Sequence, residues 1–340
     1  MPPLIDLRGL TVEIPTPAGW IRPVDDVSFS LEKGESLGLV GESGSGKSML
    51  ALALMGLLPQ GARVRGEAWL ADPSFLGASA NGVGGNGASS RANLLALSER
   101  EQTGVRGRDI AMIFQEPMTA LNPVMRVGAQ IAEAIRAHEQ DLSRGEVDRR
   151  VAAALERAAV PEPALRARQY PHQLSGGLRQ RAMIAMALAG GNGNAPRLLI
   201  ADEPTTALDV TVQKQILDLL AKLRRDLGLA LLFITHDLAV VARVADRIAV
   251  TYAGRIVEEG PAREVLERPR HPYTAGLLRA SPQLVRHKLE PIAGAVPSLT
   301  ALPSGCAFEP RCPVRIAECV AAVPDLRDAG PEHRARCVLV

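Results

Sequence analysis

The chain contains a glycine-rich loop with the spacing G-x-x-x-x-G-K-[ST], formed by Gly41, Glu42, Ser43, Gly44, Ser45, Gly46, Lys47 and Ser48. Glycines allow backbone N–H groups to converge on an anion, and a helix that starts at the loop adds the positive end of its dipole. In this pattern, Lys47 would reach the β- and γ-phosphates of a nucleotide, and the Ser48 hydroxyl would bind Mg²⁺. An apolar run before the loop and an Ala- and Leu-rich run after it supply the strand and the helix that the pattern requires. The loop therefore predicts a nucleotide site.

Two adjacent carboxylates, Asp202 and Glu203, follow the apolar run 198–201. A carboxylate at the end of a buried strand can hold Mg²⁺ through water, and its neighbour can polarise the attacking water as a general base. A lone Asp-Glu pair is more often a solvated turn, but a phosphate loop upstream favours the catalytic interpretation. We therefore expect Asp202 to be a magnesium ligand and Glu203 to be the catalytic base.

A second helix N-terminus suited to phosphate is indicated at Ser175, Gly176 and Gly177, which lead into the helical run 182–189. Trp20 stands where an aromatic ring could stack on a nucleobase, although packing against a turn is an equally good explanation.

Four cysteines lie in the last 35 residues, spaced C-x5-C-x6-C-x17-C: Cys306, Cys312, Cys319 and Cys337. Four thiolates gathered in a reducing compartment suit soft metals, either zinc or an iron–sulfur cluster. The spacing alone does not choose between the two. Four ordinary thiols in a loop-rich tail are the alternative.

Apolar periodicity predicts the elements that would position these residues. Alternating residues indicate strands at 4–14 and 24–31, which suggests an antiparallel β-layer ahead of the nucleotide site. Further along, buried strands alternate with helices, and polar residues follow each strand. The strands are expected at 36–40, 110–114, 198–204 and 229–235, and the helices at 49–58, 127–168, 182–189 and 216–227. This alternation indicates a parallel sheet with its site at the carboxyl ends of the strands.

Composition narrows the class of protein. A chain of 340 residues that is 46% hydrophobic suggests about two globular domains. The net charge of +2 gives no indication of nucleic-acid binding. No apolar run approaches the ~18–20 residues of a membrane span, and the first residues do not form a secretion signal, so we expect a cytoplasmic protein. Two low-complexity stretches, 71–91 and 190–194, are expected to be surface loops without an assigned function.

Together the motifs resemble the ATP-binding subunit of an ABC transporter, in particular of the peptide/nickel importer subfamily that takes up oligopeptides and dipeptides. Five motifs occur in the family's order: the phosphate loop at 41–48, Gln115, the Leu-Ser-Gly-Gly signature at 174–177, the Asp202-Glu203 pair, and His236. Asp209 fits the family's D-loop, and the stretches 114–123 and 270–274 are typical of the subfamily.

The resemblance implies an α/β fold: a P-loop NTPase ABC cassette with a mixed or parallel sheet core, an antiparallel β-layer, an inserted helical subdomain and a small C-terminal extension that contains the cysteines. The cassette would span 1–260, with the helical subdomain at about 116–185, and the extension would span 261–340.

The resemblance also implies roles for single residues, with ATP and Mg²⁺ as cofactors. Gln115 would contact the metal and the water, and His236 would steady the γ-phosphate. The metal ligands would be Ser48, Gln115 and Asp202. The signature Ser175–Gly177 would face the nucleotide on a second ATPase subunit, so that two ATP molecules are sandwiched between two subunits. Some members of the subfamily carry a [4Fe–4S] cluster on a matching set of cysteines, which favours this cluster over zinc.

We therefore expect an ATP-hydrolysing subunit that powers the import of oligopeptides or dipeptides. Its partners would be a second, identical or related ATPase subunit, two transmembrane permease subunits and, indirectly, a substrate-binding protein. The chain would then lie at the cytoplasmic face of the membrane.

Nickel or glutathione could be the cargo instead of peptides. A soluble ABC ATPase of DNA repair or translation is the alternative of another class, but such proteins usually carry two cassettes, coiled-coil arms or a strongly basic face. A module that binds ATP without hydrolysis is disfavoured because Glu203 and His236 are both present.

Overall fold

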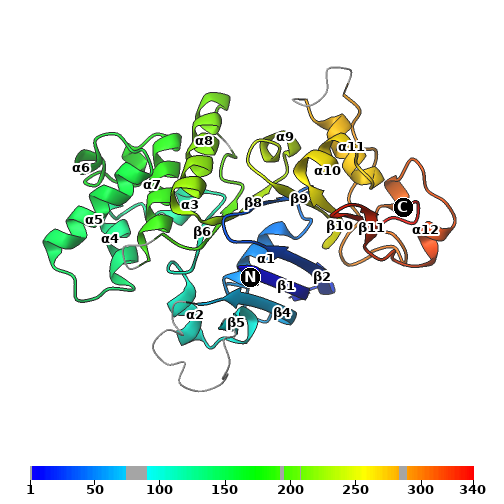
Figure 1. Ribbon diagram of the computed structural model, residues 1–340, viewed down its shortest axis with the longest axis horizontal. Helices are drawn as coiled ribbons and strands as arrows, with labels where there is room; N and C mark the ends of the chain where they lie inside the picture. Colours follow the sequence, from blue (N-terminus) through cyan, green and yellow to red (C-terminus); the bar gives the residue numbers. More distant parts are fainter. Residues whose placement is uncertain (1, 74–89, 192–194, 207, 283–288) are drawn as a thin grey trace.

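The centre of the molecule is a mixed eight-stranded β-sheet with the strand order β11-β12-β10-β9-β3-β8-β7-β6 (Figure 1). The structure is a computed structural model that describes residues 2–73, 90–191, 195–206, 208–282 and 289–340. From β6 to β9, neighbouring strands run parallel, whereas β10, β11 and β12 add to the sheet in antiparallel fashion. The strands span Ser36–Val40 (β3), Ile110–Ile113 (β6), Leu198–Asp202 (β7), Ala230–Thr235 (β8), Arg247–Tyr252 (β9), Arg255–Pro261 (β10), Arg327–Gly330 (β11) and His333–Ala335 (β12).

The parallel part of this sheet confirms the strands predicted from continuous apolar runs. Every residue of β3, β6, β7 and β8 is buried, as expected for a parallel sheet that is covered on both faces. The strands β9 and β10 were not among the predicted strands, although the alternation in the segment 247–252 is a strand signal.

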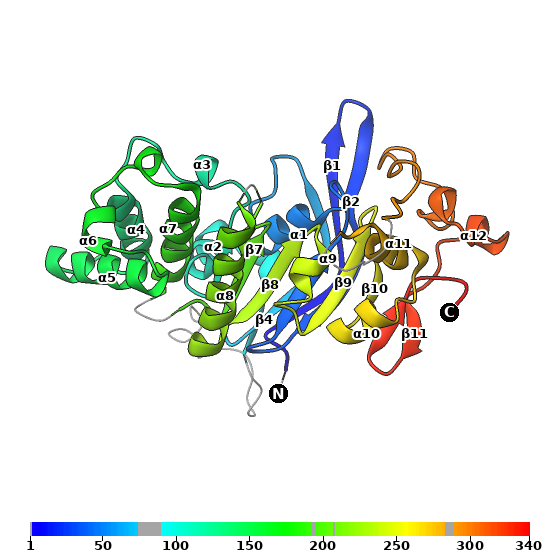
Figure 2. The same ribbon diagram turned by 90° about the horizontal axis from the view of Figure 1, so that it is seen from above.

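A second, four-stranded sheet has the order β2-β1-β4-β5 and is antiparallel throughout. Its strands span Ile5–Thr16 (β1), Gly19–Leu31 (β2), Arg63–Ala71 (β4) and Arg91–Asn93 (β5). The long hairpin of β1 and β2 reaches beyond the rest of the molecule (Figure 2). The predicted antiparallel layer is therefore confirmed, and β4 and β5 extend it.

Helices surround the core sheet. Helix α1 (Lys47–Leu54) begins at the phosphate loop, and α8 (Val210–Leu227) ends at Gly228, whose φ of +62° gives the left-handed end that favours glycine. The remaining helices outside the insert are α2 (Glu99–Val105), α9 (Leu238–Val241), α10 (Ala262–Glu267), α11 (Pro272–Ala280) and α12 (Glu318–Ala321). Short 3₁₀ turns lie at Leu94–Ala96 and Glu309–Arg311 outside the insert and at Pro171–Gln173 within it. Among the described residues, none of the helices combines the length and apolar character of a membrane span.

A helical insert separates β6 from β7. It comprises α3 (Pro117–Ala120), α4 (Val127–Arg136), α5 (Arg144–Arg157), α6 (Pro163–Arg166) and α7 (Gly176–Ala189). These helices form a group at one end of the molecule (Figures 1 and 2). The apolar positions that predicted amphipathic helices, Ile131, Ile135, Val151 and Leu155, are all buried.

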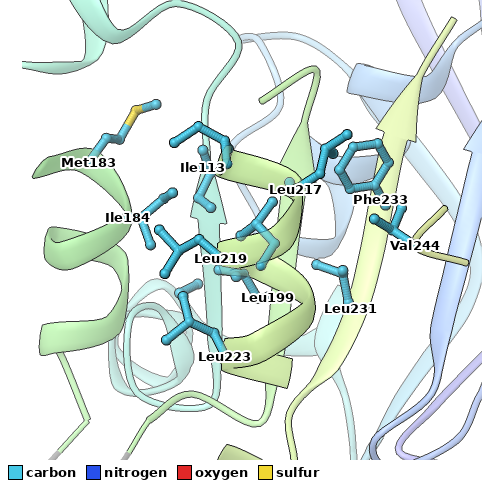
Figure 3. Packing of buried hydrophobic residues seen from close by; sticks show 14 of the residues in the cluster. Ile113, Met183, Ile184, Leu199, Leu217, Leu219, Leu223, Leu231, Phe233 and Val244 are labelled. Carbon is cyan, nitrogen blue, oxygen red and sulfur yellow. The ribbon is translucent and has the colours of Figure 1, made fainter. Parts of the chain in front are cut away.

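The insert and the core sheet share one apolar cluster. Figure 3 shows Leu217 and Leu223 of α8 among side chains of the sheet, such as Leu231 and Phe233 of β8, with Ile184 of α7 on the other side of the helix. Truncation of such a buried leucine to alanine costs about 2–5 kcal/mol. Helix α8 thus connects the insert to the strands that carry the site.

The region after residue 260, predicted as a small C-terminal extension, contributes to the core sheet. In β12, Ala335 and Arg334 pair with Glu258 and Glu259 of β10, and the Arg336 N–H donates to the Val257 carbonyl over 2.8 Å. Most of the two glycine-rich stretches lies outside the described residues, at 74–89 and 192–194. The interpretation of these stretches as loops therefore stays a prediction.

Candidate nucleotide-binding and hydrolysis site

The phosphate loop joins β3 to α1, as the sequence predicts. Gly46 lies at the N-cap of α1 with φ +98°, and a Cβ at this position would come within 1.7 Å of the Pro23 carbonyl oxygen. Gly44 has φ +80°. Both positions therefore require glycine because of backbone conformation, and Gly46 also because of the approach of β2.

Lys47 is buried inside this loop, with 5% of its surface exposed. Its Nζ donates to the carbonyl oxygens of Gly41 and Glu42, over 2.7 and 3.0 Å, and to the Ser45 hydroxyl over 3.3 Å. Burial lowers the pKa of Lys47, while the carboxylates of the nearby acidic residues oppose this shift. The ammonium group is thus held over the loop, where the predicted phosphates would lie.

Asp202 ends β7 with 4% of its surface exposed. Burial raises the pKa of Asp202, and a hydrogen bond with the Ser48 side chain lowers it. Its Oδ1 is buried without a hydrogen-bond partner among the described residues. A carboxylate oxygen beside a hydroxyl is the hard donor set that Mg²⁺ prefers, so Asp202 and Ser48 fit the predicted metal.

Glu203 is the centre of the predicted catalytic group. Its carboxylate oxygens lie 3.1 Å from His236 Nδ1, 3.3 Å from Gln115 Nε2 and 2.8 Å from the Thr206 hydroxyl. Its backbone has φ +45°, and its N–H donates to the Ile234 carbonyl of β8. Such a conformation costs on the order of 1–3 kcal/mol and is typical of functional positions. The structure thus brings together all three residues predicted to be catalytic.

The signature residues lie at the start of α7. Ser175 is the N-cap, and its hydroxyl accepts the Leu178 N–H over 3.4 Å. A Cβ on Gly177 would lie 2.7 Å from Val212 of α8, and Asp209 caps α8 by accepting the Val212 N–H over 2.9 Å. Both figures place α7 with the helical insert and apart from α1 (Figures 1 and 2). The signature and Asp209 therefore form a second cluster, separate from the phosphate loop of the same chain.

Models of two protein families match the sequence. The model named ABC transporter matches residues 24–206, which is more than half of the chain. The chain belongs to the ABC transporter family. A second model, for the C-terminal region of oligopeptide/dipeptide transporters, matches residues 257–319. The resemblance that the motifs indicate is thereby confirmed, and membership of the family implies that the chain binds ATP and Mg²⁺ and hydrolyses ATP.

Similar proteins cover nearly the whole chain. A Brucella ovis protein provisionally named a peptide import ATP-binding protein is 48% identical, and the match covers 99% of this chain and 97% of the relative. The oligopeptide transport ATP-binding protein OppD of Escherichia coli is 45% identical over 98% of this chain and 92% of the relative. A solved dimeric ATP-binding cassette in a post-hydrolysis state, bound to ADP and Pi, has a TM-score of 0.61 and 28% identity, and the match covers 76% of this chain and 99% of the solved chain. This likeness confirms the predicted α/β cassette fold.

Trp20 lies at the tip of the β1–β2 hairpin of this ABC cassette and is 45% exposed. The Arg63 guanidinium stacks on its ring at 3.9 Å from the centroid. A nucleobase would compete with Arg63 for that face, and base stacking on Trp20 stays a prediction.

The cysteines Cys306, Cys312, Cys319 and Cys337 line one cavity in the C-terminal part of the ABC protein and are free thiols. Burial raises the pKa of Cys306, Cys312 and Cys337. In the described part of the chain, no group of three or more His, Cys, Asp or Glu residues is arranged to hold a metal ion. His333, a histidine of the same segment, lies 2.8 Å from Glu258. The four thiols thus share one cavity without being arranged as a metal site in the described residues, and the iron–sulfur or zinc site stays a prediction.

Sequence reasoning missed the contacts of three residues with the phosphate loop of the cassette. The Thr251 hydroxyl lies 3.1 Å from the Ser45 hydroxyl and donates to the Val40 carbonyl. The other two, Tyr273 and Arg311, contact Glu42. All three lie more than 200 positions from their partners, so no local spacing could have revealed them.

Proposed function

We propose that this chain hydrolyses ATP to power the import of oligopeptides or dipeptides through partner membrane subunits. The observation that carries the proposal is the joint match of the ABC transporter model and the oligopeptide/dipeptide C-terminal model on one chain. Relatives named oligopeptide transport ATP-binding protein, which match over nearly their full length, support this cargo over nickel or glutathione. The C-terminal match also disfavours a soluble ATPase of DNA repair or translation.

In the proposed mechanism, Lys47 and the loop N–H groups bind the β- and γ-phosphates of ATP. Ser48, Asp202 and Gln115 would hold Mg²⁺, which supplies charge neutralisation on the phosphates. Glu203 accepts a proton from the attacking water as general base.

Three contacts support this role of Glu203. Its carboxylate is oriented by His236, Gln115 and Thr206. Because these partners fix both oxygens, the carboxylate can stay directed at a water without reorganising during the reaction. His236 would also steady the γ-phosphate, for which its 53% exposed side chain is accessible.

We also propose that hydrolysis requires a second ATPase subunit, either another copy or a related chain. The cluster of Ser175, Gly176, Gly177 and Asp209 would complete the site on that partner. Its position at the start of α7 supports the proposal, because free helix N–H groups suit a phosphate. The similar cassette that is dimeric and bound to ADP and Pi supports it as well. Two permease subunits and a substrate-binding protein would complete the transporter, with this chain peripheral at the cytoplasmic face of the membrane.

The predicted [4Fe–4S] cluster is a separate proposal and takes no part in hydrolysis. Its support is that all four cysteines line one cavity. Anaerobic purification followed by a visible spectrum and metal analysis tests it. About four iron atoms per chain with broad visible absorption would support a cluster, and one zinc without colour would indicate a structural metal instead. Absence of both metals would contradict a metal site.

Uptake by cells tests the proposed cargo. Cells with the wild-type chain and its partner subunits should accumulate a labelled tripeptide, and cells with Glu203→Gln should not. Nickel uptake in the same cells is the control and should be equal in both. Loss of nickel uptake with normal peptide uptake would show that the cargo proposal is wrong.

A further inference from the structure

Glu42, the second residue of the phosphate loop, is attached to the C-terminal segment, defined here as residues 261–340. Its backbone N–H donates to the Tyr273 hydroxyl over 2.9 Å. Its carboxylate accepts two hydrogen bonds from the Arg311 guanidinium, over 2.7 and 3.1 Å. Two separate parts of the C-terminal segment therefore contact one residue of the nucleotide site.

Arg311 occupies a built pocket, since only 4% of its side chain is exposed. Its Nε donates to the Ala293 carbonyl over 3.0 Å, and Nη1 also lies 3.3 Å from the Tyr252 hydroxyl. The guanidinium lies 5.9 Å from the centroid of the Phe308 ring. A buried guanidinium needs a paired carboxylate, and Glu42 supplies it in the bidentate geometry that makes such a pair strong.

Three aromatic rings fix the positions of the two groups that contact Glu42, the Tyr273 hydroxyl and the Arg311 guanidinium. The ring centroids of Tyr252 and Tyr273 are 4.6 Å apart, and Phe308 lies 5.3 Å from each of them. All three side chains are nearly fully buried. Burial also raises the pKa of Tyr273, so its hydroxyl stays neutral at physiological pH. Tyr273 thus belongs to a packed cluster, and Arg311 lies against the same rings.

Every polar group of Glu42 has a hydrogen-bond partner, and the C-terminal segment supplies the partners of its N–H and carboxylate. Besides its N–H and carboxylate, its carbonyl oxygen accepts the Lys47 ammonium over 3.0 Å. Phosphate binding requires the loop backbone to be arranged before the ligand arrives, and a free carboxylate within the loop would repel a triphosphate. Arg311 meets both conditions, because it fixes the position of Glu42 and neutralises the charge of its carboxylate.

We propose that Arg311 and Tyr273 are positioning residues for nucleotide binding, acting through Glu42, so that the C-terminal segment holds the phosphate loop ready for ATP. This inference rests on the ATP binding that the proposed function requires. It gives the C-terminal segment a role in the nucleotide site that does not involve its cysteines.

Equilibrium binding of MgATP and steady-state ATPase kinetics test the inference. We expect Arg311→Met to weaken ATP binding about 10-fold, as expected for loss of a hydrogen bond to a charged group. The kcat at saturating ATP should change less than about two-fold, because a positioning defect is overcome once the loop is occupied. Tyr273→Phe keeps the ring packing and should weaken binding about three-fold, as a single neutral hydrogen bond would.

A double-mutant cycle separates this role from general destabilisation. Combining Glu42→Gln with Arg311→Met should weaken ATP binding no further than Arg311→Met alone, because Arg311 acts through Glu42. Multiplying losses, or an Arg311→Met protein that binds ATP like the wild type, would overturn the inference.

Arg315→Met is the matched control. Arg315 lies in the same segment, is 62% exposed and pairs with Glu309, so ATP affinity should be unchanged. If Arg311→Met does not fold, Arg311→Lys and Tyr273→Phe provide the test, with circular dichroism as the check on folding, and wild-type affinity in both would overturn the inference. A wild-type chain that binds no ATP would contradict the proposed function, whereas normal wild-type binding with unaffected variants contradicts only this inference.

Discussion

Two helices of this chain begin at sequences suited to phosphate, and their surroundings differ. Helix α1 begins at the phosphate loop, where Lys47 lies near the carboxylates of Asp202 and Glu203. Helix α7 is capped by Ser175, and its first two residues approach Leu208, in the loop before α8, and Val212 of α8. One helix start thus has a complete set of catalytic neighbours in the same chain, and the other has none among its described contacts. This difference is what a site shared between two subunits would produce.

The largest expected effect comes from a substitution at the start of α7, in the signature. Ser175→Arg should reduce ATP turnover by about 10³-fold or more, the effect of losing a stabilising group supplied by a partner. ATP binding to the monomer should be retained, because the phosphate loop is untouched. Fluorescent nucleotide binding and phosphate release measure the two quantities.

A mixture of two inactive variants provides the control for this prediction. Ser175→Arg and Lys47→Met are each inactive in this view, yet a mixed dimer contains one intact loop facing one intact signature. An equal mixture should therefore recover activity above the sum of its parts. A strictly additive mixture would mean that the signature does not act on a second copy of this chain.

The second prediction concerns the catalytic neighbours of α1, in particular the base Glu203. Glu203→Gln keeps the shape of the side chain but removes the proton acceptor, so turnover should fall about 10²–10⁴-fold. ATP binding should persist, and the ATP-bound dimer should accumulate in size-exclusion chromatography. Glu267→Gln, an exposed carboxylate far along the chain, should behave like the wild type. Full activity of Glu203→Gln would show that another group is the base.

The smallest expected effect is the change in the free energy of unfolding when Asp202 is replaced. Burial raises the pKa of Asp202, so the folded chain binds this proton more tightly than the unfolded chain does. The ionised carboxylate therefore destabilises the fold at neutral pH, and this cost declines as the pH falls toward the raised pKa. Asp202→Asn should raise the free energy of unfolding at pH 7 by about 1 kcal/mol while weakening Mg²⁺-dependent hydrolysis.

Chemical denaturation at pH 7 and at pH 5 measures the free energy of unfolding of the wild type and of Asp202→Asn. The difference between the two proteins should be smaller at pH 5. Asp226→Asn is the control, because its carboxylate on α8 is 56% exposed. A free energy of unfolding for Asp202→Asn that is no higher than that of Asp226→Asn at pH 7 would contradict the prediction.

The same comparison explains how much could be predicted from sequence. The phosphate loop and the Asp202-Glu203 pair were predictable because strand, loop and helix follow one another within a few residues. The apolar runs of β3, β7 and β8 were equally local. By contrast, Arg311 reaches Glu42 across 269 positions, and neither residue lies in a pattern that indicates the other. Long-range packing decides that contact.

The C-terminal strands illustrate the second limit. Segment 327–335 is polar and short, so neither periodicity nor β-propensity indicates a strand. It forms β11 and β12 because β10 offers an unpaired edge and because Glu258 and Glu259 bind His333 and Arg334. Such a strand depends on its partner for its existence, and the sequence of the segment alone does not contain that partner.

This pairing also bears on where the polypeptide can be shortened. A chain cut after residue 260 would leave β10 as an open sheet edge, a template for pairing with other molecules. It would also remove the partners of the Glu258 carboxylate, which is 0% exposed, whereas Glu259 would lose Arg334 and keep Arg247. Expression of the cassette alone should therefore give aggregates, and a useful fragment must keep the final residues of the chain.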